Sequence, residues 1–131
     1  MGADRVDCYL VVADRVRSLR EPLRGLLGGL KDKGRRVAAY GASAKGSTLL
    51  NYCGIGRETL DFLVDRSTVK QGRYVPGSGL RVDAPARLLD EMPDFVLLLT
   101  WNFADEILAQ QAEYRRRGGR FIVPVPYPRV A

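Results

Sequence analysis

The sequence predicts an α/β domain with a mostly parallel sheet between two layers of helices. From residue 34 onward, short apolar runs alternate with segments of helical periodicity. The apolar runs are continuous and do not alternate with polar residues, as expected of parallel strands that are buried on both faces. Helical segments between them supply the crossovers that parallel strands require. Together these observations indicate a small Rossmann-like fold with three layers.

The length of the chain bounds its organisation. Its 131 residues fit one domain, 1–131, with a helical lead-in at 1–33 and an α/β core at 34–131. Pro22 is expected to kink or split the lead-in helix. We expect the lead-in to connect the core to another domain if Met1 starts an excised fragment of a longer protein. Apolar residues at helical spacing are Val6, Tyr9, Leu10, Ala13, Val16, Leu19, Leu23, Leu26, Leu27 and Leu30.

The first half of the core contains three strand-like runs. A strand is predicted at 35–41 from RRVAAYG, and a short helix at 45–52 follows it. The run TLDFLVD predicts a second strand at 59–65, and GLRVD predicts a possible short strand at 79–83. A short helix is expected at 84–92, so the chain can cross over the sheet before the next strand.

The second half repeats the pattern with longer elements. The run DFVLLLT predicts a strong strand at 94–100, and apolar spacing predicts an amphipathic helix at 103–117. Asn102 is the expected N-cap of that helix, with Asp105 as its partner three residues later. A final strand is predicted at 120–126 from RFIVPVP.

The turn GASAKGST, at 41–48, leads from the first strand into the first core helix. A phosphate-binding P-loop places its lysine after the second glycine, whereas Lys45 precedes Gly46 here. A dinucleotide fingerprint needs glycine where Ser43 stands. Neither motif is therefore present. Both motifs nevertheless use a tight turn whose unpaired N–H groups at a helix start attract an anion, and this turn keeps that property.

Two interpretations of the turn stay open. In the first, the N–H groups bind a phosphate with help from side-chain donors, which are Ser43, Lys45, Ser47 and Thr48. In the second, Gly41 and Gly46 only allow the strand and helix to pack tightly, and Ser47 or Thr48 caps the helix. The first predicts about millimolar affinity for a lone phosphate.

Other candidate binding residues follow the predicted strands, since ligands of such sheets bind at the carboxyl ends of the strands. Asp65 ends the second strand, where it could accept a ribose hydroxyl or simply end the strand. Lys70, in the glycine-rich segment VKQGRYVPGSG, could reach a phosphate, or the segment could be a surface turn. Trp101 could stack on a base or sugar, or pack in the core.

Composition excludes several classes of function. Cys8 and Cys53 form no CxxC pair and the chain has no histidine, so we predict no metal site. The net charge of +6 is scattered except in YRRRGGR, where Arg115–Arg117 end a predicted helix before two glycines, so no nucleic-acid partner is predicted. Apolar runs are too short for a membrane span. A cytoplasmic, metal-free domain is the expectation.

Four segments resemble one known family. They are VAAYGASAKGSTLLNYCGI, DFLVDRSTVKQGRYVPGSGLRV, PDFVLLLTWNFADEI and YRRRGGRFIVPVP, in order between about residues 34 and 128. The combination is similar to the C-terminal domain of nucleotide-sugar C-methyltransferases. These enzymes transfer a methyl group to a ring carbon of a TDP-linked deoxy-keto-sugar in antibiotic sugar biosynthesis.

The resemblance implies a division of labour between domains. Family members have a zinc-binding N-terminal domain, a central S-adenosylmethionine-binding domain and this C-terminal domain, which helps to hold the TDP-sugar. It implies a substrate-facing side lined by the turn Gly41–Ser47, which includes Ser43, Lys45 and Gly46, and by Asp65, Lys70, Trp101 and Asn102. The zinc-ligand cysteines and the family's proposed histidine base are absent from this sequence. We therefore expect no catalytic residue, no bound cofactor and no turnover from this chain alone.

Two other functions compete with this interpretation. An independent nucleotide-binding or regulatory module for NAD would suit the fold and Asp65, although GxGxxG is absent. A scaffold without a ligand, whose N-terminal helix docks a partner protein, would predict oligomers without any response to nucleotide. A response of the monomer to TDP would favour the methyltransferase interpretation over both.

Overall fold

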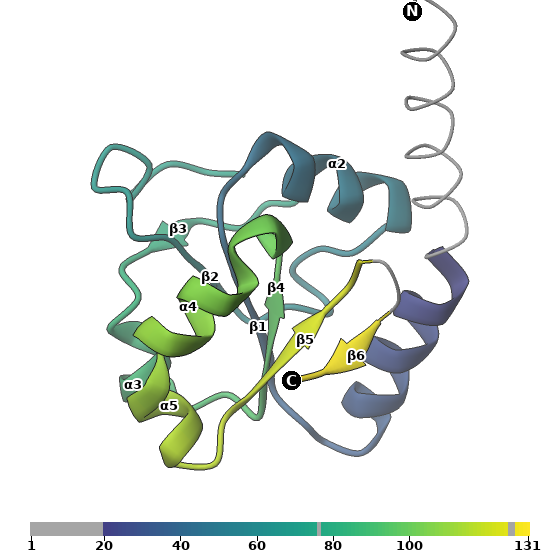
Figure 1. The fold of residues 1–131 in the computed structure, drawn as a ribbon. Helices are drawn as coiled ribbons and strands as arrows, with labels where there is room; N and C mark the ends of the chain where they lie inside the picture. The colour runs from purple at the N-terminus through teal and green to yellow at the C-terminus, as the bar shows by residue number, and fades with distance from the viewer. Residues whose placement is uncertain (1–19, 76, 126–127) are drawn as a thin grey trace, which may run out of the picture.

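A six-stranded sheet forms the centre of the computed structural model, which describes residues 20–75, 77–125 and 128–131 (Figure 1). Its order is β3-β2-β1-β4-β5-β6, and every neighbouring pair except β5 and β6 is parallel. The mostly parallel Rossmann-like sheet is therefore confirmed. The strands are β1 Val37–Tyr40, β2 Leu63–Val64, β3 Val82–Asp83, β4 Phe95–Leu98, β5 Arg120–Val123 and β6 Arg129–Val130.

The strand order reverses between β1 and β4. The chain moves from β1 outward to β2 and β3, and then returns to the other side of β1 for β4 and β5. The two central strands are in full register, from Val37 opposite Phe95 to Tyr40 opposite Leu98. Connections that leave these two strands diverge, and such a point is where open α/β sheets bind ligands.

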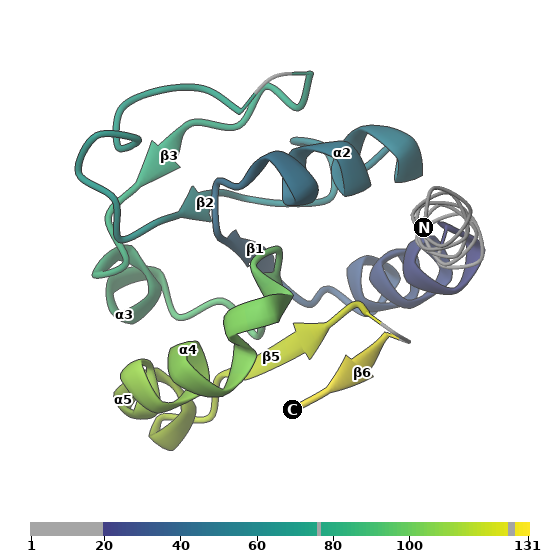
Figure 2. The same ribbon diagram turned by 45° about the horizontal axis from the view of Figure 1, so that its top comes forward.

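Helices cover both faces of the sheet and create two cores (Figure 2). On one face lie α2, Ala44–Cys53, and the helix of residues 20–32, over a core that includes Val37 and Ala39. On the other face lie α3 Arg87–Glu91, α4 Ala104–Gln110 and α5 Ala112–Arg116, over a core that includes Ala38 and Tyr40. All four residues of β1 are buried, which explains its unbroken apolar sequence.

The lead-in forms a helix over residues 20–32 as its leucine spacing predicts. Leu23 and Leu27 are buried in the core beneath α2, and Leu26 and Leu30 pack against it. Apolar residues from Val6 to Leu19 lie outside the described residues, and so does Ser18, whose carbonyl the Pro22 ring would disturb. Within residues 20–32 Pro22 does not split the helix. The kink therefore stays a prediction.

The long helix predicted at 103–117 is divided. A 3-10 turn, η1 Trp101–Phe103, precedes α4, and the chain breaks again at Gln111 before α5. The prediction of Asn102 as N-cap was wrong, because Asn102 lies inside η1 and no side chain caps α4. The backbone turns directly after β4, with Phe103 N–H donating to the Thr100 carbonyl.

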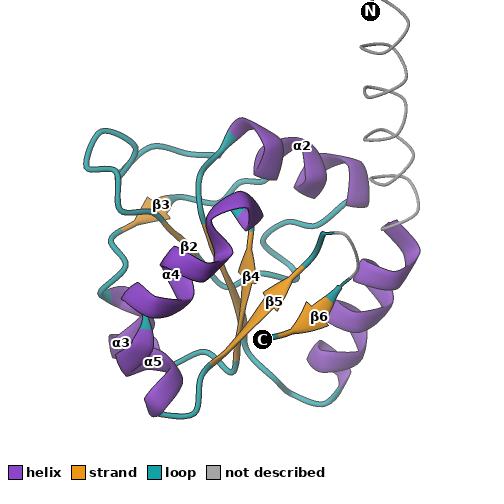
Figure 3. Cartoon of the chain, in the orientation of Figure 1, coloured by secondary structure: helices purple, strands orange, loops and turns teal. Residues whose placement is uncertain are grey.

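The last predicted strand also ends early. β5 stops at Val123, and β6 then pairs antiparallel with it along the sheet edge, opposite Ile122 and Val123. The arginine cluster that precedes β5 has a structural role, since Arg116 and Arg117, at the end of α5, both donate to Glu113. Between β2 and β3 the chain is almost entirely loop (Figure 3), and this loop supplies one wall of the site described next.

Candidate functional site

Ser43 begins α2 as its N-cap. The residue is extended, with φ −88° and ψ 159°, and its Oγ accepts a 3.0 Å hydrogen bond from Gly46 N–H. Its carbonyl accepts from Ser47 N–H at 2.9 Å. The expectation that Ser47 or Thr48 caps this helix was therefore wrong, and Thr48 Oγ1 instead donates to the Ala44 carbonyl inside the first turn.

Some N–H groups of the turn are used by the fold and others are open. Gly41 N–H donates to the Val64 carbonyl at 2.8 Å, and Ala42 N–H donates to Asp65 Oδ2 at 2.7 Å. Within the described part of the chain, the backbone N–H groups of Ser43, Ala44 and Lys45 have no hydrogen-bond acceptor. These three N–H groups are the open donors at the N-terminus of α2, and together they can bind an anion.

The two glycines of the turn have packing roles. A Cβ on Gly46 would lie 2.6 Å from Leu99 Cβ, and Gly46 is buried beneath that strand end. Gly41 has φ 107°, and a Cβ there would lie 2.6 Å from Thr100 Cγ2. Tight strand-helix packing, proposed as the alternative role of these glycines, is thus present. The packing leaves the open N–H groups available, so both interpretations of the turn can hold at once.

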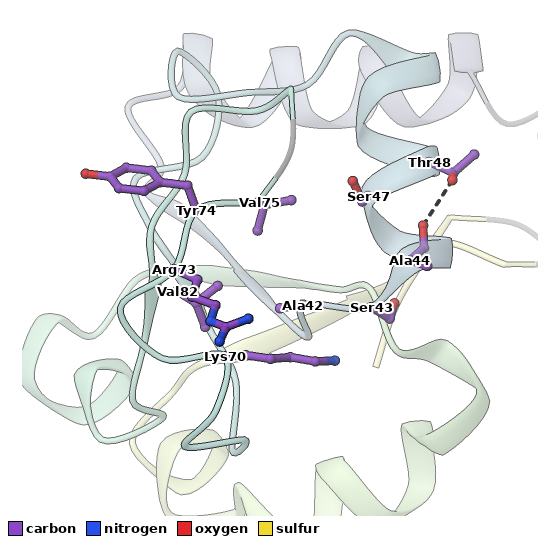
Figure 4. Close-up of a pocket in the computed structure, with 10 residues that line it drawn as sticks. All are labelled: Ala42, Ser43, Ala44, Ser47, Thr48, Lys70, Arg73, Tyr74, Val75 and Val82. Carbon is purple, nitrogen blue, oxygen red and sulfur yellow. Dashed lines mark hydrogen bonds between the residues drawn. The ribbon is translucent and has the colours of Figure 1, made fainter.

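A pocket of about 410 Å³, named here the α2 pocket, lies between the start of α2 and the loop after β2 (Figure 4). Figure 4 shows the Lys70 side chain extending toward the turn at Ser43, while the Tyr74 ring points away from it. The lining residues are Ala42, Ser43, Ala44, Ser47, Thr48, Lys70, Arg73, Tyr74, Val75 and Val82. The structure thus brings the predicted Ser43, Ser47 and Lys70 together.

The α2 pocket has an excess of positive charge. Lys70 and Arg73 form no ion pair with any described residue, and neither does Lys45, which is exposed on α2 outside the pocket lining. Among the residues that the structure describes, no acidic side chain lines the pocket. An anion in this pocket would therefore meet two cations and the open end of a helix without displacing an internal partner.

Asp65 ties the turns after β1 and β2 together. Its Oδ2 accepts from Ala42 N–H and its Oδ1 accepts from Ser67 N–H, each at 2.7 Å. Its backbone carbonyl accepts from Gln71 Nε2 at 2.9 Å, which fixes the start of the loop that carries Lys70. The observed role of Asp65 is to hold the site in shape, and contact with a ligand stays a prediction.

Trp101 and Asn102 lie apart from the α2 pocket. Trp101 is half-buried and packs against both cores, which is the packing role considered for it from the sequence. Asn102 is exposed in η1. Neither residue lines the α2 pocket, so the structure does not bring them together with Lys70.

A second, smaller pocket lies where the strand order reverses. This switch-point pocket has a volume of about 220 Å³ and is lined by Tyr40, Asp65, Arg66, Thr100, Phe103, Glu106, Ile107 and Gln110. Tyr40 Oη and Thr100 Oγ1 are buried and have no hydrogen-bond partner among the described residues. An unpaired buried hydroxyl costs about 1 to 3 kcal/mol. Burial raises the pKa of Tyr40, with Arg66 opposing this shift and Asp65 adding to it, so the phenol stays protonated at neutral pH.

Comparison with known proteins identifies the family. Residues 1–126 match the C-methyltransferase C-terminal domain. This chain belongs to that family. The chain is also similar to the C-methyltransferase NovU of Streptomyces niveus, with 43% identity over 122 residues, or 93% of this chain and 29% of the relative. It therefore spans less than a third of the length of that relative. The resemblance to C-methyltransferases noted in the sequence is confirmed at the level of the domain.

Several residues of this C-methyltransferase domain escaped prediction from the sequence. Arg73 and Tyr74 line the α2 pocket, and the signal for Arg73 was its position three residues after Lys70 in a loop without acidic residues. Tyr40 and Thr100 had no signal, because each ends an apolar strand and looks like part of the core. Their unpaired hydroxyls become visible only when the strands are placed side by side.

The described part of the domain offers neither a metal site nor a membrane span. Among those residues no three side chains of the His, Cys, Asp or Glu type gather as metal ligands. Cys53 is buried in the core, where burial raises the pKa of its thiol. No helix in the described ranges is long and apolar enough to cross a bilayer.

Proposed function

We propose that this C-methyltransferase C-terminal domain binds the TDP-linked deoxy-keto-sugar substrate of an S-adenosylmethionine-dependent enzyme. One observation carries the proposal. Lys70 and Arg73 face the open N–H groups at the start of α2 across a pocket of about 410 Å³, and neither has an ion-pair partner among the described residues. A diphosphate matches this arrangement, since it presents several anionic oxygens to dispersed donors.

The proposed contacts are individually weak, which bears on how the domain would work. A helix N-terminus contributes roughly 0.3 to 1 kcal/mol and a hydrogen bond to a charged group roughly 1.5 to 3 kcal/mol. The α2 pocket is open to solvent on the side of Tyr74, which is 68% exposed. We therefore expect about millimolar affinity for phosphate alone. Tighter binding would require the nucleoside and sugar to be enclosed by the rest of the parent enzyme.

In this proposal the domain positions the substrate and does not react with it. The described residues include no histidine, and the carboxylate nearest in sequence to the pocket loop, Asp65, is occupied by two N–H donors. A base in another part of the parent protein would remove the proton next to the sugar ketone. S-adenosylmethionine, bound by a neighbouring domain, would supply the methyl group that the resulting carbanion attacks, while the bond from that methyl to sulfur breaks and S-adenosylhomocysteine leaves. Fixing the diphosphate would hold the reacting carbon in place.

Titration of the isotope-labelled domain by two-dimensional NMR tests the proposal. TDP and TDP-glucose should shift the amide signals of Ser43, Ala44 and Lys45 weakly and saturably. S-adenosylmethionine, which carries no phosphate, should not shift them, and NAD should bind no more strongly than TDP. Lys70→Gln and Arg73→Gln should each weaken TDP binding by about five- to tenfold, because each removes one charged contact. A stronger response to NAD, or no response to TDP, would overturn it.

A matched control separates the pocket from general charge. Lys33→Gln removes one positive charge at the amino ends of the strands, beside Arg35 and Asp94 and away from the α2 pocket. It should leave the affinity for TDP nearly unchanged, since interactions across the domain are screened at physiological salt. If Lys33→Gln weakens binding as much as Lys70→Gln does, the interaction is with net charge and not with the α2 pocket.

A further inference from the structure

Two buried hydroxyl groups at the switch point lack the partners that buried polar groups normally have. Tyr40 is 3% exposed, and its Oη makes no hydrogen bond of good geometry to any described residue. Burial raises the pKa of Tyr40, and the Gln111 side chain, which lies close enough to act on it as a hydrogen-bonding group, opposes this with a smaller effect. Thr100 Oγ1 is also buried and has no hydrogen-bond partner among the described residues. By contrast, Tyr114 in the same core donates to the Pro93 carbonyl at 2.7 Å. Unpaired buried groups in a native fold require an explanation, and one explanation is a ligand.

The surroundings of these hydroxyls indicate the kind of ligand. The switch-point pocket adds the carboxylates of Asp65 and Glu106, the amide of Gln110 and the guanidinium of Arg66 to the two hydroxyls. Phe103 lines the same pocket and is 56% exposed. Planar polar side chains around an aromatic ring suit a sugar. The polar side chains can form hydrogen bonds with several sugar hydroxyls, while the aromatic ring covers the apolar face of the sugar.

One hydrogen bond joins the two pockets. Asp65 lines the switch-point pocket, and its Oδ2 accepts from the N–H of Ala42, which lines the α2 pocket. A ligand with a diphosphate in the α2 pocket could therefore place its next group directly across this bond. The reversal of strand order at β1 and β4 opens the sheet at the same point.

We propose that the switch-point pocket holds the sugar ring of the nucleotide-sugar, with Tyr40 and Thr100 hydrogen-bonded to its oxygen atoms. This inference rests on the proposed function, since it places the second half of the ligand whose diphosphate lies in the α2 pocket. Both hydroxyls are covered in the free domain. Binding therefore requires displacement of an exposed side chain that lines the pocket, such as Phe103 or Gln110. Tyr40 and Thr100 are thus assigned as residues that select for a sugar.

Comparing TDP with TDP-glucose on the same chain tests the inference. TDP-glucose should bind about two- to tenfold more tightly than TDP, and it alone should shift the amides of Gly41 and Arg66. In Tyr40→Phe and in Thr100→Val the ratio of the affinity for TDP-glucose to the affinity for TDP should fall toward one, while the affinity for TDP itself is kept. The free Tyr40→Phe protein should unfold at the same or a higher urea concentration than wild type, because the lost hydroxyl has no partner.

Tyr114→Phe is the matched control, because it removes a hydroxyl that does have a partner. It should lower the unfolding midpoint and leave the preference for TDP-glucose unchanged. Equal binding of TDP and TDP-glucose by the wild type would overturn the inference, and so would a loss of stability in Tyr40→Phe as large as in Tyr114→Phe. Shifts at Gly41 and Arg66 with TDP alone would place the nucleoside in this pocket and also overturn it.

Failure of the proposed function gives a different result. If neither TDP nor TDP-glucose shifts the amides of Ala44 and Lys45, the diphosphate site is absent and the inference fails with it. If both ligands shift those amides but bind equally, the diphosphate site stands and only the placement of the sugar is wrong.

Discussion

The N–H of Ala42 donates to Asp65 Oδ2 at 2.7 Å, which fastens the turn after β1 to the turn after β2. The second oxygen of the same carboxylate accepts from Ser67 N–H. Asp65 therefore holds both walls of the α2 pocket in position. Loss of this carboxylate should affect the fold and the ligand site together.

We expect Asp65→Ala to lower the free energy of unfolding by about 2 to 3 kcal/mol, because two N–H groups lose a charged acceptor. Urea denaturation measures the change. Asp90→Ala is the control, since the Asp90 side chain is exposed and has no hydrogen bond or ion pair to any described residue. An equal loss in the two variants would show that Asp65 acts only through net charge.

Gly46→Ala should also destabilise the domain, by about 1 to 3 kcal/mol, because the added Cβ would lie 2.6 Å from Leu99 Cβ. The comparison is Gly28→Ala in the helix of residues 20–32, where an added Cβ meets no atom within 4 Å. That change should raise stability by up to about 1 kcal/mol, since alanine favours a helix more than glycine does. Thermal or urea unfolding should show that Gly46→Ala lowers stability and Gly28→Ala raises it. Two changes of the same sign would contradict the packing argument.

The two ends of the sheet should respond differently to loss of a cation. Arg36 donates to Asp61 Oδ2, to the Glu91 carbonyl and to Glu91 Oε2, between 2.8 and 3.2 Å. We expect Arg36→Gln to lower the free energy of unfolding by about 1 kcal/mol, since the network is partly exposed. Lys70→Gln should change it by less than about 0.5 kcal/mol, because Lys70 has no ion-pair partner in the described part. Urea denaturation would refute this if Lys70→Gln were the more damaging.

The stability of α5 should depend on acid pH through Glu113. Hydrogen bonds from Arg116, and then from Arg117, hold the pKa of this carboxyl below its usual value of 4.5. Its contribution is therefore complete above pH 4.5 and is lost as pH falls through the lowered pKa. Glu113→Gln should reduce the urea midpoint at pH 7, and that effect should shrink as the pH falls below 4.5. Glu58→Gln, which removes an exposed carboxylate without an ion pair in the described part, should show no such convergence.

The elements that the sequence predicts well are those whose apolar pattern has one physical solution. VAAY and FVLL are apolar throughout, and only strands buried on both faces explain that in a chain of this size. The start of α2 was predicted less well, because Ser47 or Thr48 was the expected cap whereas Ser43 is the observed one. Contact between Gly46 and Leu99 decides among them, since it fixes where the helix meets the sheet. That contact joins residues 53 positions apart, so the sequence near the start of α2 does not reveal it.

The site was predicted in part for the same reason. Lys70 was found because it lies in a glycine-rich loop after a strand, but the loop's path depends on pairing of Tyr74 with Arg81 and on Val75 N–H donating to Leu80. These bonds bring Arg73 into the α2 pocket. A break after β4 likewise separates Trp101 and Asn102 from Lys70, and periodicity in that segment does not reveal it.

Ion pairs are concentrated around Arg36, at the amino ends of the strands. This bears on whether a loop segment can be exchanged between related proteins. The contacts that stabilise this end share no residue with the loop that carries Lys70 and Arg73. A chimera that takes only residues 66–75 from a relative should therefore keep the same sheet while acquiring a different ligand preference. Natural variation and protein engineering can thus change what this domain recognises without having to rebuild what keeps it folded.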